Sequence, residues 1–151
     1  MIFVALYLEA DLHESCLRIS PRHQDYATLP IQTGFDWSPL SGCAFDELYL
    51  VVFRSVRRPE ADLDLLLEHD QRAYAEALES GGLLRYFKGE ANERRECMSF
   101  CLWETSERAG EAASAASHKS AAKITARMYL SYVLDRYWLK KAGRELVFER
   151  I

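Results

Sequence analysis

The chain has 151 residues, of which 49% are apolar and 28% are charged, and its net charge at neutral pH is −4. This length and composition are typical of one globular domain with its own core, and they exclude a disordered chain. The acidic balance gives no basic surface of the kind that binds a phosphate backbone, so we expect no nucleic-acid partner.

Residues 1–46 are irregular, with prolines and glycines that punctuate loops and bulky apolar side chains between them. Because such side chains need burial, we expect this segment to be an arm that packs on a body formed by residues 47–151. The apolar run at residues 1–8 is too short to span a bilayer and lacks a signal-peptide pattern. We therefore expect no membrane partner, a cytoplasmic location, and four cysteines that remain thiols.

The first half of the body is predicted to form a strand, a helix and two further strands. The apolar run 48–54 is rich in β-branched and aromatic residues, which is typical of a strand buried on both faces. The basic run at residues 54–58 is typical of a solvated strand end. We expect a helix whose first turn is at Pro59 and Glu60, with Asp62 sharing the capping role, and which ends at Gly81 and Gly82. Antiparallel strands are expected to follow over residues 83–88 and 96–104.

The second half of the body is predicted to be helical and then to close with a hairpin. Ser106 is placed to cap a helix that runs to about Ala116. A longer helix is expected to follow, because His118, Thr125 and Tyr129 recur at helical spacing, together with Ala121, Met128 and Tyr132. Residues 137–141 and 145–149, joined at Ala142–Gly143, read as the closing hairpin.

The order strand, helix, strand, strand, helix, strand predicts a ferredoxin-like α+β fold. Two helices in such a fold cover one face of the sheet. The other face is apolar and must also be buried, so we expect a second copy of the chain to cover it in a sheet-to-sheet homodimer.

Two resemblances support this fold. The stretch LWETSE at residues 102–107, continued by SHK at 117–119, resembles the Trp-x-Ser-x-Glu and Ser-x-His pattern of dimeric α/β-barrel proteins, including antibiotic-biosynthesis monooxygenases. The serine falls one place late here, and no proline precedes His118. The segments at 26–31, 34–37, 51–58, 80–84 and 99–103 resemble an uncharacterised family known mainly from fungi, which implies fold and extent but no activity.

Two polar side chains interrupt the predicted apolar helix faces. His118 stands where the barrel resemblance implies a functional histidine; its imidazole could act as a general base or ligate haem iron. A structural histidine that braces the helix break is the alternative. Asp70 must be paired, protonated or directed at a ligand, because an unpaired buried carboxylate is costly. We expect Arg54 or Arg85 as its ion-pair partner, or else a role as catalytic acid.

Alternation along the third strand separates a more polar face from an apolar one. Ser99, Cys101 and Trp103, together with Cys97, are expected to line a cavity, whereas Met98, Phe100 and Leu102 are expected to meet the second copy. Arg54, Tyr86 and Tyr129 are the further residues expected to orient a ligand. Cys101 has no assigned base, so an inert thiol is the expected reading.

Together these patterns predict a small enzyme that acts on an apolar, aromatic or polyketide-like molecule by cofactor-free oxidation, cyclisation or isomerisation. The alternatives are a non-catalytic small-molecule-binding or structural dimeric module, and a haem protein with His118 as axial ligand. The sequence contains no phosphate loop, dinucleotide fingerprint or metal-ligand spacing, so we expect neither a nucleotide cofactor nor a metal site.

Overall fold

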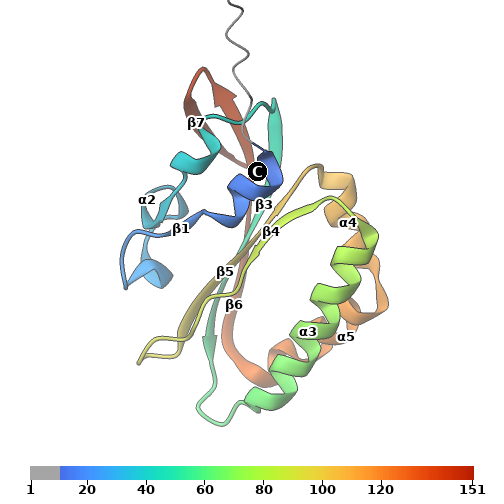
Figure 1. The fold of residues 1–151 in the computed structure, drawn as a ribbon. Helices are drawn as coiled ribbons and strands as arrows, with labels where there is room; N and C mark the ends of the chain where they lie inside the picture. The colour runs from blue at the N-terminus through green and yellow to red at the C-terminus, as the bar shows by residue number, and fades with distance from the viewer. Residues whose placement is uncertain (1–10) are drawn as a thin grey trace, which may run out of the picture.

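A five-stranded antiparallel sheet forms the centre of this computed structural model, which describes residues 11–151. The strands lie side by side in the order β4-β5-β3-β6-β7. Their bounds are β3 (Glu47–Arg57), β4 (Leu83–Phe87), β5 (Glu96–Trp103), β6 (Tyr129–Ala142) and β7 (Glu145–Arg150). The helices α3 (Leu63–Ser80), α4 (Ser106–Ser114) and α5 (Ala116–Met128) lie on one side of this sheet (Figure 1). We call the sheet surface that faces these helices the inner face.

The remaining elements belong to the arm, residues 11–46, which lies on the other side of the sheet (Figure 1). We call that surface of the sheet the outer face. The arm is built from short pieces joined by turns: α1 (Leu12–Leu17), β1 (Ser20–Pro21), η1 (Tyr26–Thr28), α2 (Ile31–Gly34), β2 (Phe35–Asp36) and η2 (Ser38–Leu40). The apolar run at residues 1–8 lies outside the described residues.

The predicted ferredoxin-like order of elements is confirmed, with local differences at the helix ends. The first long helix, α3, begins after Asp62 rather than at Pro59, because the Asp62 carboxylate accepts a hydrogen bond of 3.0 Å from Leu65 N–H. Gly81 ends this helix at φ 81°, a conformation that favours glycine. Thr105 rather than Ser106 caps α4, and the helical region breaks at Ala115, whose backbone is extended.

The second long helix is shorter than the sequence predicts. Helix α5 ends at Met128, and Tyr129 already begins β6, which pairs with β3 along most of its length. Tyr132 is therefore also a strand residue. The apolar spacing of this segment fits either period, and pairing with the central strand decides in favour of the strand. The hairpin between β6 and β7 is confirmed, with Gly143 at φ 65° in its turn.

The chain's own arm covers the outer face, where we had expected a second copy. Met98, Phe100 and Leu102 point to this face as alternation predicts, and each has no exposed surface. They form one core with Phe35 and Trp37, and with further arm residues Cys16, Ile19, Ile31 and Leu40. A second sheet cannot reach side chains that the arm has already buried. The predicted sheet-to-sheet contact is therefore wrong, and the homodimer itself stays a prediction.

Aromatic packing fastens the arm to the sheet. The ring of Phe35 lies 5.2 Å from that of Phe100 and 5.0 Å from that of Phe87, both edge-on. Trp37 lies 5.2 Å from Phe148 of β7, and its indole N–H donates a hydrogen bond of 2.9 Å to the Ile31 carbonyl. Such pairs contribute stability beyond the area that they bury.

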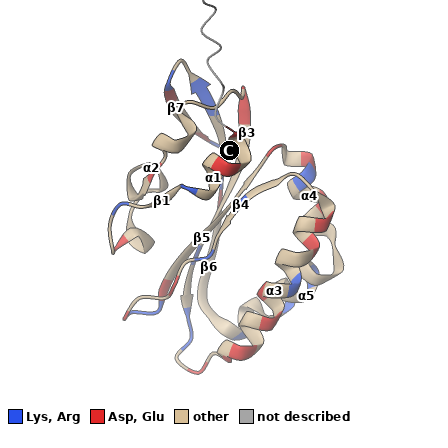
Figure 2. Ribbon diagram, in the orientation of Figure 1, with Lys and Arg blue, Asp and Glu red and all other residues tan. Residues whose placement is uncertain are grey.

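No helix among residues 11–151 is long and apolar enough to cross a membrane. Charged residues are distributed along α3, α4 and α5, those of α3 mostly acidic and those of α5 basic, whereas the middle of the sheet is largely uncharged (Figure 2).

Candidate functional site

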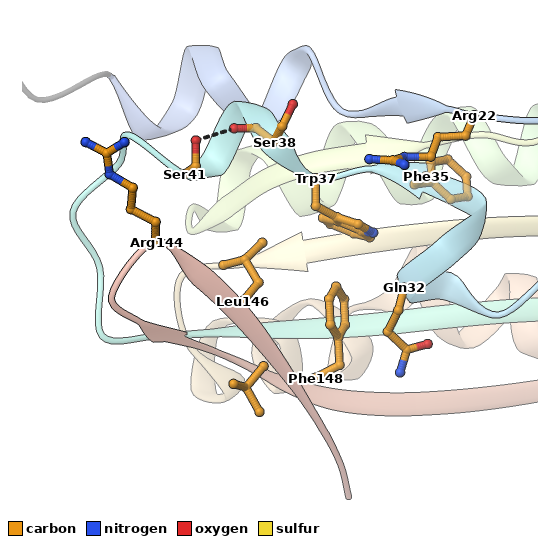
Figure 3. Close-up of a pocket in the computed structure, with 10 residues that line it drawn as sticks. Arg22, Gln32, Phe35, Trp37, Ser38, Ser41, Arg144, Leu146 and Phe148 are labelled. Atoms are coloured by element: carbon orange, nitrogen blue, oxygen red, sulfur yellow. Dashed lines mark hydrogen bonds between the residues drawn. The ribbon is translucent and has the colours of Figure 1, made fainter.

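A groove of about 520 Å³ lies between the arm and the β6–β7 hairpin (Figure 3). Its floor is apolar and aromatic, from Phe35, Trp37, Leu146 and Phe148, and its lining also includes Arg22, Gln32, Ser38, Ser41, Arg144 and Val147. None of these side chains transfers a proton readily near neutral pH. The groove therefore lacks the groups that acid–base chemistry needs. Asp70, Tyr86, Cys101, His118 and Tyr129 lie instead in the layer between the sheet and the helices.

Side chains of the inner face stay accessible although the helices lie over them. Phe53, Tyr86 and Cys101 are only partly buried, and Tyr132 and Leu134 keep 41% and 39% of their surface exposed. Their neighbours on the outer face, which include Leu50, Val52, Phe100 and Leu102, keep 1% or less. The inner face is thus covered but not sealed.

The helix that faces this surface is equally loosely packed. Leu67 and Tyr74 of α3, on the same side of the helix as Asp70, keep 43% and 40% of their surface exposed. The ring of Tyr74 lies 5.4 Å from that of Tyr86 on β4, so the two layers do meet there. We use the name inner cleft for the partly exposed side chains of the inner face together with those of α3 and α5 that face them.

Asp70 holds the polar centre of the inner cleft. The Tyr86 hydroxyl donates a hydrogen bond of 2.5 Å to Asp70 Oδ1, and Lys88 Nζ lies 3.1 Å from Asp70 Oδ2. Both carboxylate oxygens therefore have partners. The predicted partners Arg54 and Arg85 are wrong, because both side chains bond to carbonyl groups of the arm on the outer face.

The negative charge of Asp70 reaches several groups of the cleft. Burial, and then Asp70, raises the pKa of Tyr86 far above its usual value. Burial and Asp70 likewise raise the pKa of the Cys101 thiol to about 12. The pKa of Tyr132 is raised by burial and, more weakly, by Tyr129, Cys101 and Asp70. These groups all stay protonated at neutral pH, so none of them is an ionised nucleophile.

His118 lies near the start of α5, where α3 also fixes the helix. Ser117 N–H donates a hydrogen bond of 3.0 Å to the Glu76 carboxylate, which therefore braces the helix start in place of the histidine. His118 Nδ1 is buried and has no hydrogen-bond partner among residues 11–151. Burial lowers the pKa of His118, although the charges of Glu76 and Asp70 oppose this. The imidazole is thus neutral at pH 7 and has a free ring nitrogen.

The remaining predicted site residues divide between the inner cleft and other places. The ring of Tyr129 lies 5.1 Å from that of Tyr132 in a tilted arrangement. Ser99, on the inner face, accepts a hydrogen bond of 3.1 Å from Gly89 N–H. Trp103 is 4% exposed and packs with Ala77, Leu83 and Ala112, so its side chain fills the core between the sheet, α3 and α4 and is not available to a ligand. The expectation that it orients a ligand is therefore corrected.

Arg54 requires the larger correction. It pairs in register with Met98 on the outer face, and its guanidinium donates hydrogen bonds of 3.0 and 2.7 Å to the carbonyls of Ala27 and Leu29. It also lines a second concavity, of about 400 Å³, between the arm and the sheet. The sheet thus separates Arg54 from His118, and Arg54 holds the arm.

Sequence reasoning missed three residues of the inner cleft, namely Phe53, Lys88 and Tyr132. Alternation along the strand from Tyr49 would have placed Phe53 on the inner face. Alternation could not place Lys88, which comes after the end of β4, or Tyr132, which the spacing assigned to a helix. Among residues 11–151 no group of three or more histidine, cysteine or acidic side chains could hold a metal ion.

The fold is that of the antibiotic-biosynthesis-monooxygenase-like proteins, as the barrel resemblance implies. SnoaB, a cofactor-independent oxygenase from Streptomyces nogalater, is 13% identical, with 67% of this chain and 100% of SnoaB covered and a TM-score of 0.51. A protein from Nitrosomonas europaea, provisionally named an antibiotic biosynthesis monooxygenase, is 9% identical, with 65% and 93% covered and a TM-score of 0.53. Likeness at this level establishes the fold alone.

The chain belongs to the PB2B2.08-like family, whose match spans residues 7–150. The UPF0643 protein PB2B2.08 of Schizosaccharomyces pombe is 28% identical over 109 residues, which cover 67% of this chain and 50% of that protein. The chain thus spans about half the length of this curated relative. The resemblance to a fungal family is confirmed.

Proposed function

We propose that this chain is a small metabolic enzyme that binds an apolar, aromatic or polyketide-like molecule in the inner cleft. The observation that carries the proposal is a neutral, unpartnered imidazole in an incompletely filled apolar layer, within electrostatic reach of Asp70. Conversion of such a molecule by cofactor-free oxidation, cyclisation or isomerisation can begin with loss of an acidic proton. That SnoaB is a cofactor-independent oxygenase of the same fold supports this class of chemistry.

The proposed first step is proton abstraction next to a ring carbonyl. The C–H bond breaks, the proton moves to the free nitrogen of His118, and the electron pair remains on the substrate as an enolate. A neutral imidazole is the correct form for this step, because a protonated ring has no lone pair to accept the proton. The lowered pKa of His118 keeps that form available down to mildly acidic pH.

Asp70 has a positioning role in this scheme rather than that of a free acid. Because both of its oxygens are engaged, it fixes the hydroxyl of Tyr86 and the ammonium of Lys88 at one wall of the cleft. Cys101 and Tyr129 line the same cleft and supply contact surface, in keeping with a protonated thiol and a phenol of raised pKa. Ser99 supports the loop at Gly89.

Exchange of carbon-bound protons tests the proposed step without knowledge of the product. Tetralone and related aromatic ketones would be incubated with the protein in D2O, and loss of their acidic proton signals followed by NMR. We expect faster exchange with wild type, and the uncatalysed rate with His118→Ala. His23→Ala, in an exposed part of the arm, is the matched control and should match wild type. Unchanged exchange in folded His118→Ala would remove the proposed base.

The same experiment separates the alternatives. Ligand binding without exchange for any ketone would favour a non-catalytic binding module. Haem ligation by His118 is the second candidate, favoured by the unpartnered ring nitrogen. A Soret band on addition of haemin, lost in His118→Ala, would support haem binding, whereas an unchanged spectrum would exclude it.

A further inference from the structure

Arg57 is a cation of the inner cleft whose side chain lacks an ionic partner. It is the last residue of β3, and Arg95 holds its backbone through two hydrogen bonds. Arg57 N–H donates one of 2.9 Å to the Arg95 carbonyl, and Arg95 Nε donates one of 3.1 Å to the Arg57 carbonyl. These bonds hold the backbone, and the guanidinium of Arg57 is left with the hydroxyl of Tyr129 as its polar neighbour, while its buried Nε has no partner among residues 11–151. The interpretation of residues 54–58 as a solvated strand end therefore fails at this residue, which is partly buried.

The guanidinium lies on the inner side of the sheet. Arg57 pairs in register with Tyr129, just beyond an irregularity in the ladder, and the ring of Tyr129 lies against that of Tyr132 on the inner face. The positive charge of Arg57 also opposes the rise in the pKa values of Cys97 and Tyr129 that burial causes. Arg57 is therefore close to two side chains of the cleft.

No acidic side chain among residues 11–151 lies within ion-pair distance of Arg57, and its buried Nε has no hydrogen-bond partner there. The acids in the neighbourhood are engaged elsewhere: Asp70 by Tyr86 and Lys88, and Glu96 by the Asn92 amide. A partly buried charge without an ionic partner attracts an anion more strongly than a fully solvated charge does. An anionic group that enters the cleft would supply the missing ionic partner.

We infer that the ligand of the inner cleft is an aromatic carboxylate, and that Arg57 binds its carboxylate. A guanidinium presents a planar pair of donors that fits a carboxylate in a bidentate manner. The ring system then lies along Phe53 and Tyr132, whose rings are 6.3 Å apart, with Leu134 beside them. This inference rests on the proposed function, because it assumes that the inner cleft takes a small molecule.

Two probes of equal shape and different charge test the inference. Binding of naphthoate and of naphthalenemethanol would be measured by calorimetry. We expect wild type to bind naphthoate about tenfold or more tightly than the alcohol, as for a hydrogen bond to a charged group. Arg57→Met should lose that preference for naphthoate while it keeps the wild-type affinity for the alcohol. Arg57→Lys should keep part of it, because a charge remains without the planar fork. Arg94→Met, on the exposed turn between β4 and β5, is the matched control and should behave as wild type.

The outcomes separate this inference from the proposed function. Equal affinities for the two probes in wild type, or an unchanged preference in Arg57→Met, would refute the inference that Arg57 binds a ligand carboxylate. The proposal that the inner cleft binds a small molecule would not be affected. If neither probe binds folded wild type, the binding cleft itself is refuted, and the inference with it. The wild-type comparison decides the question even if an Arg57 variant fails to fold.

Discussion

The guanidinium of Arg54 donates a hydrogen bond of 2.7 Å to the carbonyl oxygen of Leu29, which ties the arm to the middle of the sheet. A second bond reaches Ala27, and Asp135 lies 4.0 Å from Arg54 Nε. Because only 27% of this side chain is exposed, its loss would leave the carbonyl groups of Ala27 and Leu29 without this donor, whereas Asp135 would keep its contact with Arg150.

We expect Arg54→Met to lower the free energy of unfolding by about 2–4 kcal/mol, the value for two hydrogen bonds from a charged donor with partly buried acceptors. The matched control is Arg150→Met. Arg150 also bonds Asp135, at 2.6 Å, but its side chain is 68% exposed, so we expect a loss below about 1 kcal/mol. Urea denaturation measures both. Equal losses of stability in the two variants would contradict the conclusion that Arg54 holds the arm on the sheet.

The two faces of the sheet should differ in their tolerance of truncation. Phe100→Ala on the sealed outer face removes a ring packed against Phe35 and Trp37, and we expect it to cost about 3–5 kcal/mol. Phe53→Ala on the inner face should cost less than half of that, because its ring is only partly buried and loses fewer contacts.

Chemical denaturation of the two variants checks this difference, and calorimetry with naphthoate adds a second readout. Only Phe53→Ala should weaken binding of the probe. A comparable destabilisation by both truncations would mean that the inner layer is packed solid, which would remove the cleft.

The sequence predicted the division of β5 between two faces because a strand alternates with a period of two, and Met98, Phe100 and Leu102 differ in character from Cys97, Ser99 and Cys101. It could not predict what covers the apolar face. The arm buries Ile19, Ile31, Phe35 and others at irregular spacing, so no periodic pattern marks a covering surface. Its bulky side chains indicated packing, but not the partner.

The misplaced residues have a second cause, which is register. Arg54 belongs to a continuous apolar strand with no polar side to fix its direction, and only pairing with Met98 assigns it to the outer face. Tyr129 and Tyr132 fit helical and strand spacing alike, and the ladder with β3 decides between them. Arg57 lies in a basic run that predicts exposure, and only tertiary contacts make it partly buried.

Cys101 should be unreactive although it is partly accessible. Burial raises the pKa of its thiol to about 12, so the thiolate that attacks an alkylating agent is scarce at pH 8. We expect negligible modification of Cys101 by iodoacetamide in the native protein and rapid modification in urea, as read by peptide mass spectrometry. Rapid alkylation of Cys101 in the native protein would contradict this and make Cys101 a candidate nucleophile.

Protonation of His118 should destabilise the fold at mildly acidic pH. Burial holds the pKa of His118 in the native state below the ordinary value near 6.5, whereas the unfolded chain has that ordinary value. Between the two values the unfolded state binds more protons, so the free energy of unfolding falls as pH drops below about 6.5 and levels off beneath the native pKa. His118→Gln, which does not titrate, should lack this component, and His23→Gln should retain it. Urea titrations from pH 5 to pH 8 measure the difference, and NMR titration of the imidazole gives the native pKa directly. A native value at or above the ordinary one would contradict this prediction, because it would show that burial does not favour the neutral ring.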